Sequence, residues 1–103
     1  MTRPIRWLAA AVLLSGCNEK DLVIESNTTW EGTVDQIGTV SGRGSARYTL
    51  DVKGQVCWVF TKTSTHGVLR VYAVDETWLG LGSEVDSDDT TREPNGQVRG
   101  CAR

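Results

Sequence analysis

The sequence predicts an all-β domain, a small antiparallel sandwich or barrel of about five to seven strands. From Ala46 to Val52, apolar and polar residues alternate, which is the period of a strand with one buried face. From Gln55 to Lys62 both faces are apolar, which is typical of a strand in the middle of a fold. No window of the domain shows a sustained helical period. A helix is expected only in the apolar segment that precedes the domain.

The first strand expected in this domain spans residues 28–34, with Trp30 and Val34 on one face. A second short strand is expected over 37–40. The run of glycine and serine at 41–45 has the composition of a loop.

A tight turn is expected between the two strongest strands. Lys53-Gly54 fits a two-residue hairpin turn, in which glycine supplies the positive φ. Such a turn would pair 46–52 with 55–62 in one antiparallel sheet and place Leu50 opposite Cys57.

The C-terminal half contains two further strands and one weaker candidate. A turn is expected over 61–66, followed by a strand over 68–74. The candidate at 77–85 is loosened by two glycines. The acidic segment 86–96 is expected to be a loop, and 97–102 the last strand.

The N-terminus carries a secretory signal. Arg3 and Arg6 precede an apolar run over 7–14, which is too short to span a bilayer, since about 20 apolar residues are needed. Leu14-Ser15-Gly16-Cys17 then resembles the lipobox of bacterial lipoproteins, an aliphatic residue and two small residues before an obligatory cysteine. The resemblance implies cleavage between Gly16 and Cys17 and a lipid on the Cys17 sulfur.

This resemblance divides the chain into three parts: a signal peptide over 1–16, the lipidated Cys17 with a polar tether over 17–27, and a single β domain over 28–103. The tether is expected to contain at most a short edge strand at its end. The resemblance also implies a cell-envelope protein whose partner is the membrane, through the lipid. In Gram-negative members an Asp after the cysteine retains the protein in the inner membrane, so Asn18 favours the outer membrane if the source is Gram-negative.

The two remaining cysteines, Cys57 and Cys101, are expected to form a disulfide, because export brings them to an oxidising compartment. The alternative of a redox pair lacks the CxxC spacing that lowers a thiol pKa. Without Arg3 and Arg6 the chain has 9 basic and 13 acidic residues, a formal charge of −4. This balance gives no indication of a nucleic-acid partner.

Three groups of residues are candidate sites. His66, the single histidine, with Ser64 nearby, is a candidate for catalysis, against the simpler interpretation of a turn residue. An acidic group is a candidate for calcium, but its spacing does not fit an EF-hand, which favours a solvated loop. Aromatic residues are candidates for a stacking platform, although such side chains more often fill a core. The acidic group is Asp86, Asp88, Asp89 and Glu93, and the aromatic group is Trp30, Trp58, Tyr72 and Trp78.

Three classes of function follow. The first is a structural or protein-binding lipoprotein of the envelope. The second is an inhibitor or ligand-binding module, because Gly44-Ser45-Ala46-Arg47-Tyr48, followed by Trp58 and a late cysteine, is similar to small β-barrel lipoproteins that inhibit c-type lysozymes. Those proteins have Ser before Gly, and their first bridging cysteine precedes the motif, unlike Cys57. An enzyme is the third class, and no clustered nucleophile, base, metal ligands or cofactor motif supports it. We therefore expect a non-enzymatic protein with no cofactor or metal.

Overall fold

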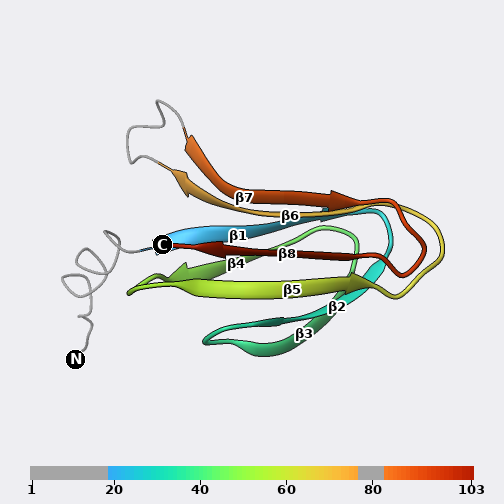
Figure 1. Ribbon diagram of the computed structural model, residues 1–103, viewed down its shortest axis with the longest axis horizontal. Coiled ribbons are helices and arrows are strands. Elements are labelled where there is room, and N and C mark those ends of the chain that lie inside the picture. The colour runs from blue at the N-terminus through green and yellow to red at the C-terminus, as the bar shows by residue number, and fades with distance from the viewer. Residues whose placement is uncertain (1–18, 77–82) are drawn as a thin grey trace, which may run out of the picture.

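A computed structural model describes residues 19–76 and 83–103. These form two four-stranded antiparallel sheets packed as a sandwich (Figure 1). The strands are β1 (Glu19–Ser26), β2 (Thr29–Val34), β3 (Gly38–Arg43), β4 (Ala46–Asp51), β5 (Val56–Lys62), β6 (Leu69–Glu76), β7 (Ser83–Thr91) and β8 (Gln97–Ala102). The all-β prediction is confirmed, with eight strands rather than five to seven.

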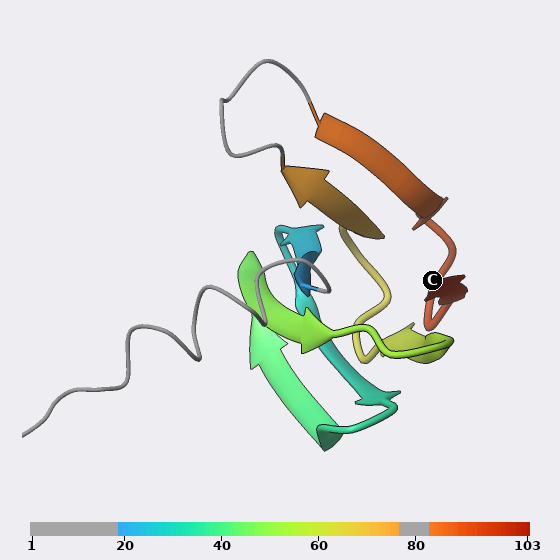
Figure 2. The same ribbon diagram turned by 90° about the vertical axis from the view of Figure 1, so that its left-hand side faces the viewer.

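Sheet A has the strand order β4-β1-β6-β7 and sheet B the order β3-β2-β5-β8. Seen end-on, the strands surround one core (Figure 2). In β5 buried side chains alternate with partly exposed ones, as the period of two requires. In β1, by contrast, three consecutive side chains are buried, and β3 has none. Among the largest buried side chains are Trp30, Trp58, Phe60, Lys62, Leu22, Ile24 and Leu50.

The tether predicted over 17–27 is wrong for most of its length. Residues 19–26 are β1, which lies inside sheet A between β4 and β6. Leu22 and Ile24 are fully buried, and Val23 is covered on the outer face by its neighbours Arg47 and Tyr72. In the sequence the apolar triplet 22–24 is flanked by polar residues, so it does not resemble an interior strand. β1 is nevertheless an interior strand, because β4 and β6 lie on either side of it. The strand β1, which begins at Glu19, is therefore part of the β domain.

The predicted hairpin between β4 and β5 is also wrong. β4 pairs with β1 in sheet A, whereas β5 pairs with β2 and β8 in sheet B. Lys53-Gly54 is a turn, with Gly54 at a φ of 115°, but the chain uses it to cross from one sheet to the other. Leu50 and Val56 thus reach the core from opposite layers.

β5 is central, as predicted, and its inward side chains fill the middle of the sandwich. Phe60 packs edge-to-face against Trp30, with ring centroids 5.6 Å apart. Gly32 leaves room for the Phe60 ring, because a Cβ there would lie 2.5 Å from a ring carbon. The glycine in the predicted strand 28–34 is therefore a packing requirement.

The loops predicted at 41–45 and 86–96 are shorter than expected. β3 continues to Arg43, and β7 includes Asp86 to Thr91. Charge does not exclude this part of β7 from the sheet, because the Asp88 carboxylate lies on the outer face against Arg70 of the adjacent strand. The remaining loop is limited to 92–96.

β7 and β8 join the two sheets along one edge. Ser87 Oγ accepts a hydrogen bond from the Cys101 N–H at 3.1 Å, and Asp89 Oδ2 accepts one from the Arg99 N–H at 3.2 Å. Gly100 permits this approach, since a Cβ there would lie 2.2 Å from Ser87 Oγ. Side chains of β7 thus satisfy the outward N–H groups of β8, a common way to protect a sheet edge.

The sandwich has two ends. One end, called here the anchor end, holds the start of β1, the end of β8 and the β2–β3 and β4–β5 turns (Figure 1). The opposite end, called the far end, holds the connections β1–β2, β3–β4, β5–β6 and β7–β8.

Candidate functional site

A pocket of about 360 Å³ opens at the far end. It lies where the β1–β2 corner meets the β5–β6 turn and the end of β3. Seven residues line it: Asn27, Thr28, Thr29, Arg43, Ser64, His66 and Gly67.

Hydrogen bonds join the two main walls of this pocket, the β1–β2 corner and the β5–β6 turn. Asn27 Oδ1 accepts a bond from the Val68 N–H at 2.9 Å, and the Ser26 hydroxyl donates to the Val68 carbonyl at 2.8 Å. Gly67 has a φ of 92° and lies so close to Asn27 that a Cβ would be 2.6 Å from Oδ1. The wall at Gly67 therefore requires glycine for both its conformation and its contact.

Lys62 supports the pocket from behind. Its side chain is only 1% exposed, and Nζ donates to the carbonyls of Gly67 at 2.6 Å and Arg92 at 3.3 Å. Burial of an ammonium is costly unless it is hydrogen-bonded, and these carbonyls meet that need. One buried cation thereby joins the β5–β6 turn to the β7–β8 loop.

The third wall is formed by β2 and β3. Thr63 donates through its N–H to the Thr29 carbonyl at 3.0 Å and through its hydroxyl to Thr29 Oγ1 at 2.7 Å. Arg43 pairs with Thr29 across β2 and β3, and it lines the pocket from the end of β3.

Ser64 and His66 both line the pocket, and the hydrogen bond between them comes from the His66 main chain. Ser64 Oγ accepts a hydrogen bond at 3.1 Å from the main-chain N–H of His66. This bond within the β5–β6 turn is a Ser turn motif. The prediction that His66 is a turn residue is confirmed.

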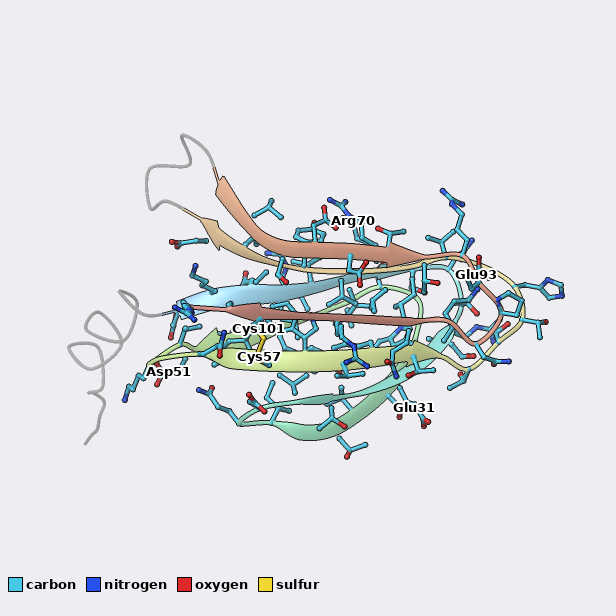
Figure 3. All side chains as sticks on the ribbon, viewed as in Figure 1. Glu31, Asp51, Cys57, Arg70, Glu93 and Cys101 are labelled. Carbon is cyan, nitrogen blue, oxygen red and sulfur yellow. A yellow bond between two sulfur atoms is a disulfide. The ribbon has the colours of Figure 1, made fainter. Side chains whose placement is uncertain are left out.

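A second cluster lies on the outer face of sheet A and is centred on Arg70 (Figure 3). Arg70 forms a bidentate pair with Asp88, Nε–Oδ1 2.9 Å and Nη2–Oδ2 2.6 Å, and its Nη1 lies 2.9 Å from Glu25 Oε1. Tyr72 donates to Glu25 Oε2 at 2.9 Å, and the guanidinium stacks 4.3 Å from the centre of the Tyr72 ring.

This Arg70 cluster shifts the acidities of its members. Hydrogen bonds from Tyr72 and then Arg70 lower the pKa of Glu25, and the bond from Arg70 lowers the pKa of Asp88. Burial and then the bond to Glu25 raise the pKa of Tyr72. Each of the four side chains has a partner inside the cluster, which therefore links β1, β6 and β7.

The predicted Cys57–Cys101 disulfide is confirmed (Figure 3). The two cysteines are directly opposite in the β5–β8 pair. The bridge crosslinks these two adjacent strands of sheet B. Gly16 and Cys17, the predicted cleavage and lipidation site, lie outside the described residues, as does the signal segment 1–16.

The aromatic platform is not formed as proposed. Trp30 and Trp58 are each 2% exposed and belong to the core, and Tyr72 belongs to the Arg70 cluster. Trp78 lies outside the described residues. The preferred interpretation of Trp30 and Trp58 as core residues is confirmed.

Two members of the acidic group, Asp88 and Asp89, have different partners. Asp88 is held by Arg70, while Asp89 accepts hydrogen bonds from the main-chain N–H groups of Thr90 and Arg99. In residues 19–76 and 83–103 no group of three or more His, Cys, Asp or Glu side chains is arranged to hold a metal ion.

The segment that resembles the lysozyme inhibitors spans the β3–β4 corner and the start of β4. Gly44 has a φ of 79°, and its carbonyl accepts a bond from Trp30 Nε1 at 2.8 Å. The Ser45 hydroxyl accepts the N–H of Ser26, and Arg47 pairs with Asp21 at 2.9 Å. These side chains serve the local structure.

Sequence reasoning named Ser64 and His66 but missed the rest of the pocket. Lys62 lies an even number of residues from the buried Trp58 and Phe60 in the same strand, so its side chain points to the same, inward face. This alternation was the signal in the sequence. Asn27 and Arg43 had no such signal, because only the tertiary fold brings them together.

No family model, curated protein or solved structure matches this chain. In the part of the chain that the structure describes, no helix has the length and apolar character needed to cross a membrane.

Proposed function

We propose that this protein is a lipid-anchored component of the bacterial cell envelope whose β-sandwich is a non-enzymatic binding domain. The lipobox-like Leu14-Ser15-Gly16-Cys17 supports the anchor. The observation that carries the proposal is the position of β1, because only Asn18 separates Cys17 from Glu19, the first residue of the sandwich. The lipid and the anchor end are thus adjacent.

This arrangement orients the domain. β1 has eight residues and runs from the anchor end to the far end, a length of about 25 Å at the usual rise of a strand. A lipid on Cys17 places the anchor end at the membrane surface and turns the far-end pocket away from it. A partner in the envelope, or at the cell surface, then meets the pocket first.

The pocket supports binding rather than catalysis. Its walls are held by hydrogen bonds between main chain and side chains, so that it is largely preformed. The hydrogen bond from the His66 main-chain N–H to Ser64 Oγ is one that stabilises a turn. The fold therefore presents a fixed polar surface to a partner.

Lipidation is tested by mass spectrometry of the full chain expressed in a bacterial host. The expected product begins at Cys17 and carries acyl chains, and globomycin causes accumulation of the form that keeps residues 1–16. Cys17→Ser removes the acyl mass, whereas Ser15→Ala, which keeps a small residue, leaves it. A mature protein with an unmodified Cys17 contradicts the proposal.

Binding is tested by crosslinking of the lipidated protein in intact cells. A photo-crosslinking residue at Arg92, exposed at the far end, is expected to capture a partner, whereas the same residue at Lys53, at the anchor end, captures lipid or nothing. Equal capture of one partner from both positions contradicts the proposed orientation.

A further inference from the structure

The far-end pocket presents hydrogen-bond donors to a ligand, because the side-chain oxygens of Asn27, Ser64 and Thr29 already accept hydrogen bonds within the protein. Asn27 Oδ1 receives the Val68 N–H, which fixes the amide orientation and leaves its NH₂ group free to donate. Ser64 Oγ receives the His66 N–H, so its own hydrogen is free to point into the pocket. Thr29 Oγ1 receives the Thr63 hydroxyl and has the same freedom.

The charge in the lining of the pocket is positive, which suits the same kind of ligand as these donors. Arg43 contributes a permanent positive charge to the lining, and His66 a second group that donates hydrogen bonds. No carboxylate is among the seven lining residues. Behind the wall, the buried ammonium of Lys62 lies 2.6 Å from the Gly67 carbonyl. A ligand in this pocket therefore meets hydrogen-bond donors and one cationic side chain, Arg43.

We propose that the far-end pocket binds an oxyanion, a carboxylate or phosphate group carried by the partner. This inference deepens the proposed function, and it rests on the domain being a binding module but not on the lipid. Arg43 supplies the charge and a planar set of donors that suits both kinds of oxyanion. Asn27, Thr29 and Ser64 supply neutral donors around the same volume, which is large enough for the group and its first attached atoms.

The pocket is preformed, and this matters for affinity. Lys62, Asn27 and Gly67 hold the β5–β6 turn against the β1–β2 corner before any ligand arrives. Binding then costs little ordering of the protein. A small anion is expected to bind without movement of the strands.

The test uses the lipidated full-length mature protein in neutral detergent micelles, titrated at constant ionic strength and followed by NMR. The probes are sodium acetate, sodium phosphate and acetamide, the last a neutral analogue of acetate. Acetate or phosphate is expected to shift the amide signals of Ser64, His66 and Gly67 with a saturating curve, and acetamide is not. The anion that binds more tightly identifies the source as a carboxylate or a phosphate.

Two variants at the far end give the matched comparison. Arg43→Gln is expected to weaken anion binding about tenfold, because it removes the charged donor. Arg92→Gln removes an equal charge from an exposed residue outside the lining, and is expected to change binding by less than about twofold.

Three outcomes overturn the inference: no saturable shift with either anion, acetamide binding as tightly as acetate, or equal effects of the two variants. Amide spectra of the free variants that match the wild type show that each is folded. Loss of the anion site leaves the acylation of Cys17 unaffected, so failure of this inference and failure of the proposed function give different results.

Discussion

Cys57 of β5 and Cys101 of β8 face each other with Cα atoms 4.0 Å apart, joined by a disulfide. The main-chain N–H and C=O groups of Cys57 both point away from β8, to the Asp35 carboxylate at 2.9 Å and the Asp35 N–H at 3.0 Å. The cysteines thus occupy a non-hydrogen-bonded position of the antiparallel pair, where opposite side chains are closest. The bridge replaces the hydrogen bonds that this position lacks and attaches β8 to the central strand of sheet B.

The first prediction concerns this bridge. The double variant Cys57→Ala/Cys101→Ala is expected to lower the free energy of unfolding by about 2–4 kcal/mol, because it releases a closed loop of 44 residues in the unfolded chain. Urea unfolding of the oxidised proteins measures the difference. Wild type treated with a reductant is the control and should show a similar loss. A loss below about 0.5 kcal/mol in both contradicts the prediction.

The second prediction concerns the buried Lys62. Lys62→Met keeps most of the side-chain volume but leaves the carbonyls of Gly67 and Arg92 without their donor. We expect a loss of about 1–3 kcal/mol in unfolding free energy, as for other buried groups deprived of a partner. Amide hydrogen exchange should also accelerate in the β5–β6 turn and the 92–96 loop. Lys53→Met, at an exposed lysine in the β4–β5 turn, is the control and should change stability by less than about 0.5 kcal/mol.

The third prediction concerns acid sensitivity of the Arg70 cluster. The folded-state pKa values of Glu25 and Asp88 lie below their ordinary values of 4.5 and 3.8. Their contribution to stability is therefore complete above these values, and it is lost as the pH falls through them toward the folded-state pKa values. Because the side chains are partly exposed, the effect is modest and is weakened by salt.

Carboxyl titration by NMR checks this third prediction. Tyr72→Phe should raise the pKa of Glu25 toward 4.5, because the Tyr72 hydrogen bond is the largest cause of its shift. The same variant should leave the pKa of Asp88 low, since Arg70 remains in place. Arg70→Met should raise both. An unchanged pKa of Glu25 in Tyr72→Phe contradicts the assignment.

Local patterns identified most strands but not their partners. The alternation in Ala46–Val52 and the apolar segment Gln55–Lys62 correspond to β4 and β5. Proximity in sequence suggested a hairpin, whereas β4 pairs with β1, a strand whose short apolar triplet is surrounded by charged residues. Which strands pair depends on how much apolar surface the whole sandwich buries, and a short stretch of sequence does not show this.

The same limit applies to charged segments and to the pocket. The acidic part of β7 has the composition of a loop. Its place in a strand could not be predicted locally, because the Arg70 that pairs with Asp88 lies on another strand. The disulfide was predictable, since only two cysteines remained after Cys17. The pocket was not, because its seven residues come from three separate stretches of the chain.

The last prediction compares two buried tryptophans. Trp30 and Trp58 are each 2% exposed, but only the indole of Trp30 is hydrogen-bonded, to the Gly44 carbonyl at 2.8 Å. Trp58 Nε1 is buried with no hydrogen-bond partner among the described residues. Substitution by Phe removes part of the ring in both cases, which opens a cavity of similar size. In Trp30→Phe it also removes a satisfied donor, whereas in Trp58→Phe it removes an unsatisfied one.

We therefore expect Trp30→Phe to be more destabilising than Trp58→Phe by about 1 kcal/mol or more in unfolding free energy, the worth of one hydrogen bond. Trp58→Ala should cost about 3–5 kcal/mol, because the whole ring leaves the core. Urea unfolding of the three variants with the disulfide intact provides the comparison. If Trp58→Phe is as destabilising as Trp30→Phe, the Trp58 indole has a partner in solution, since an unsatisfied buried donor carries its own desolvation cost and its removal offsets part of the lost packing.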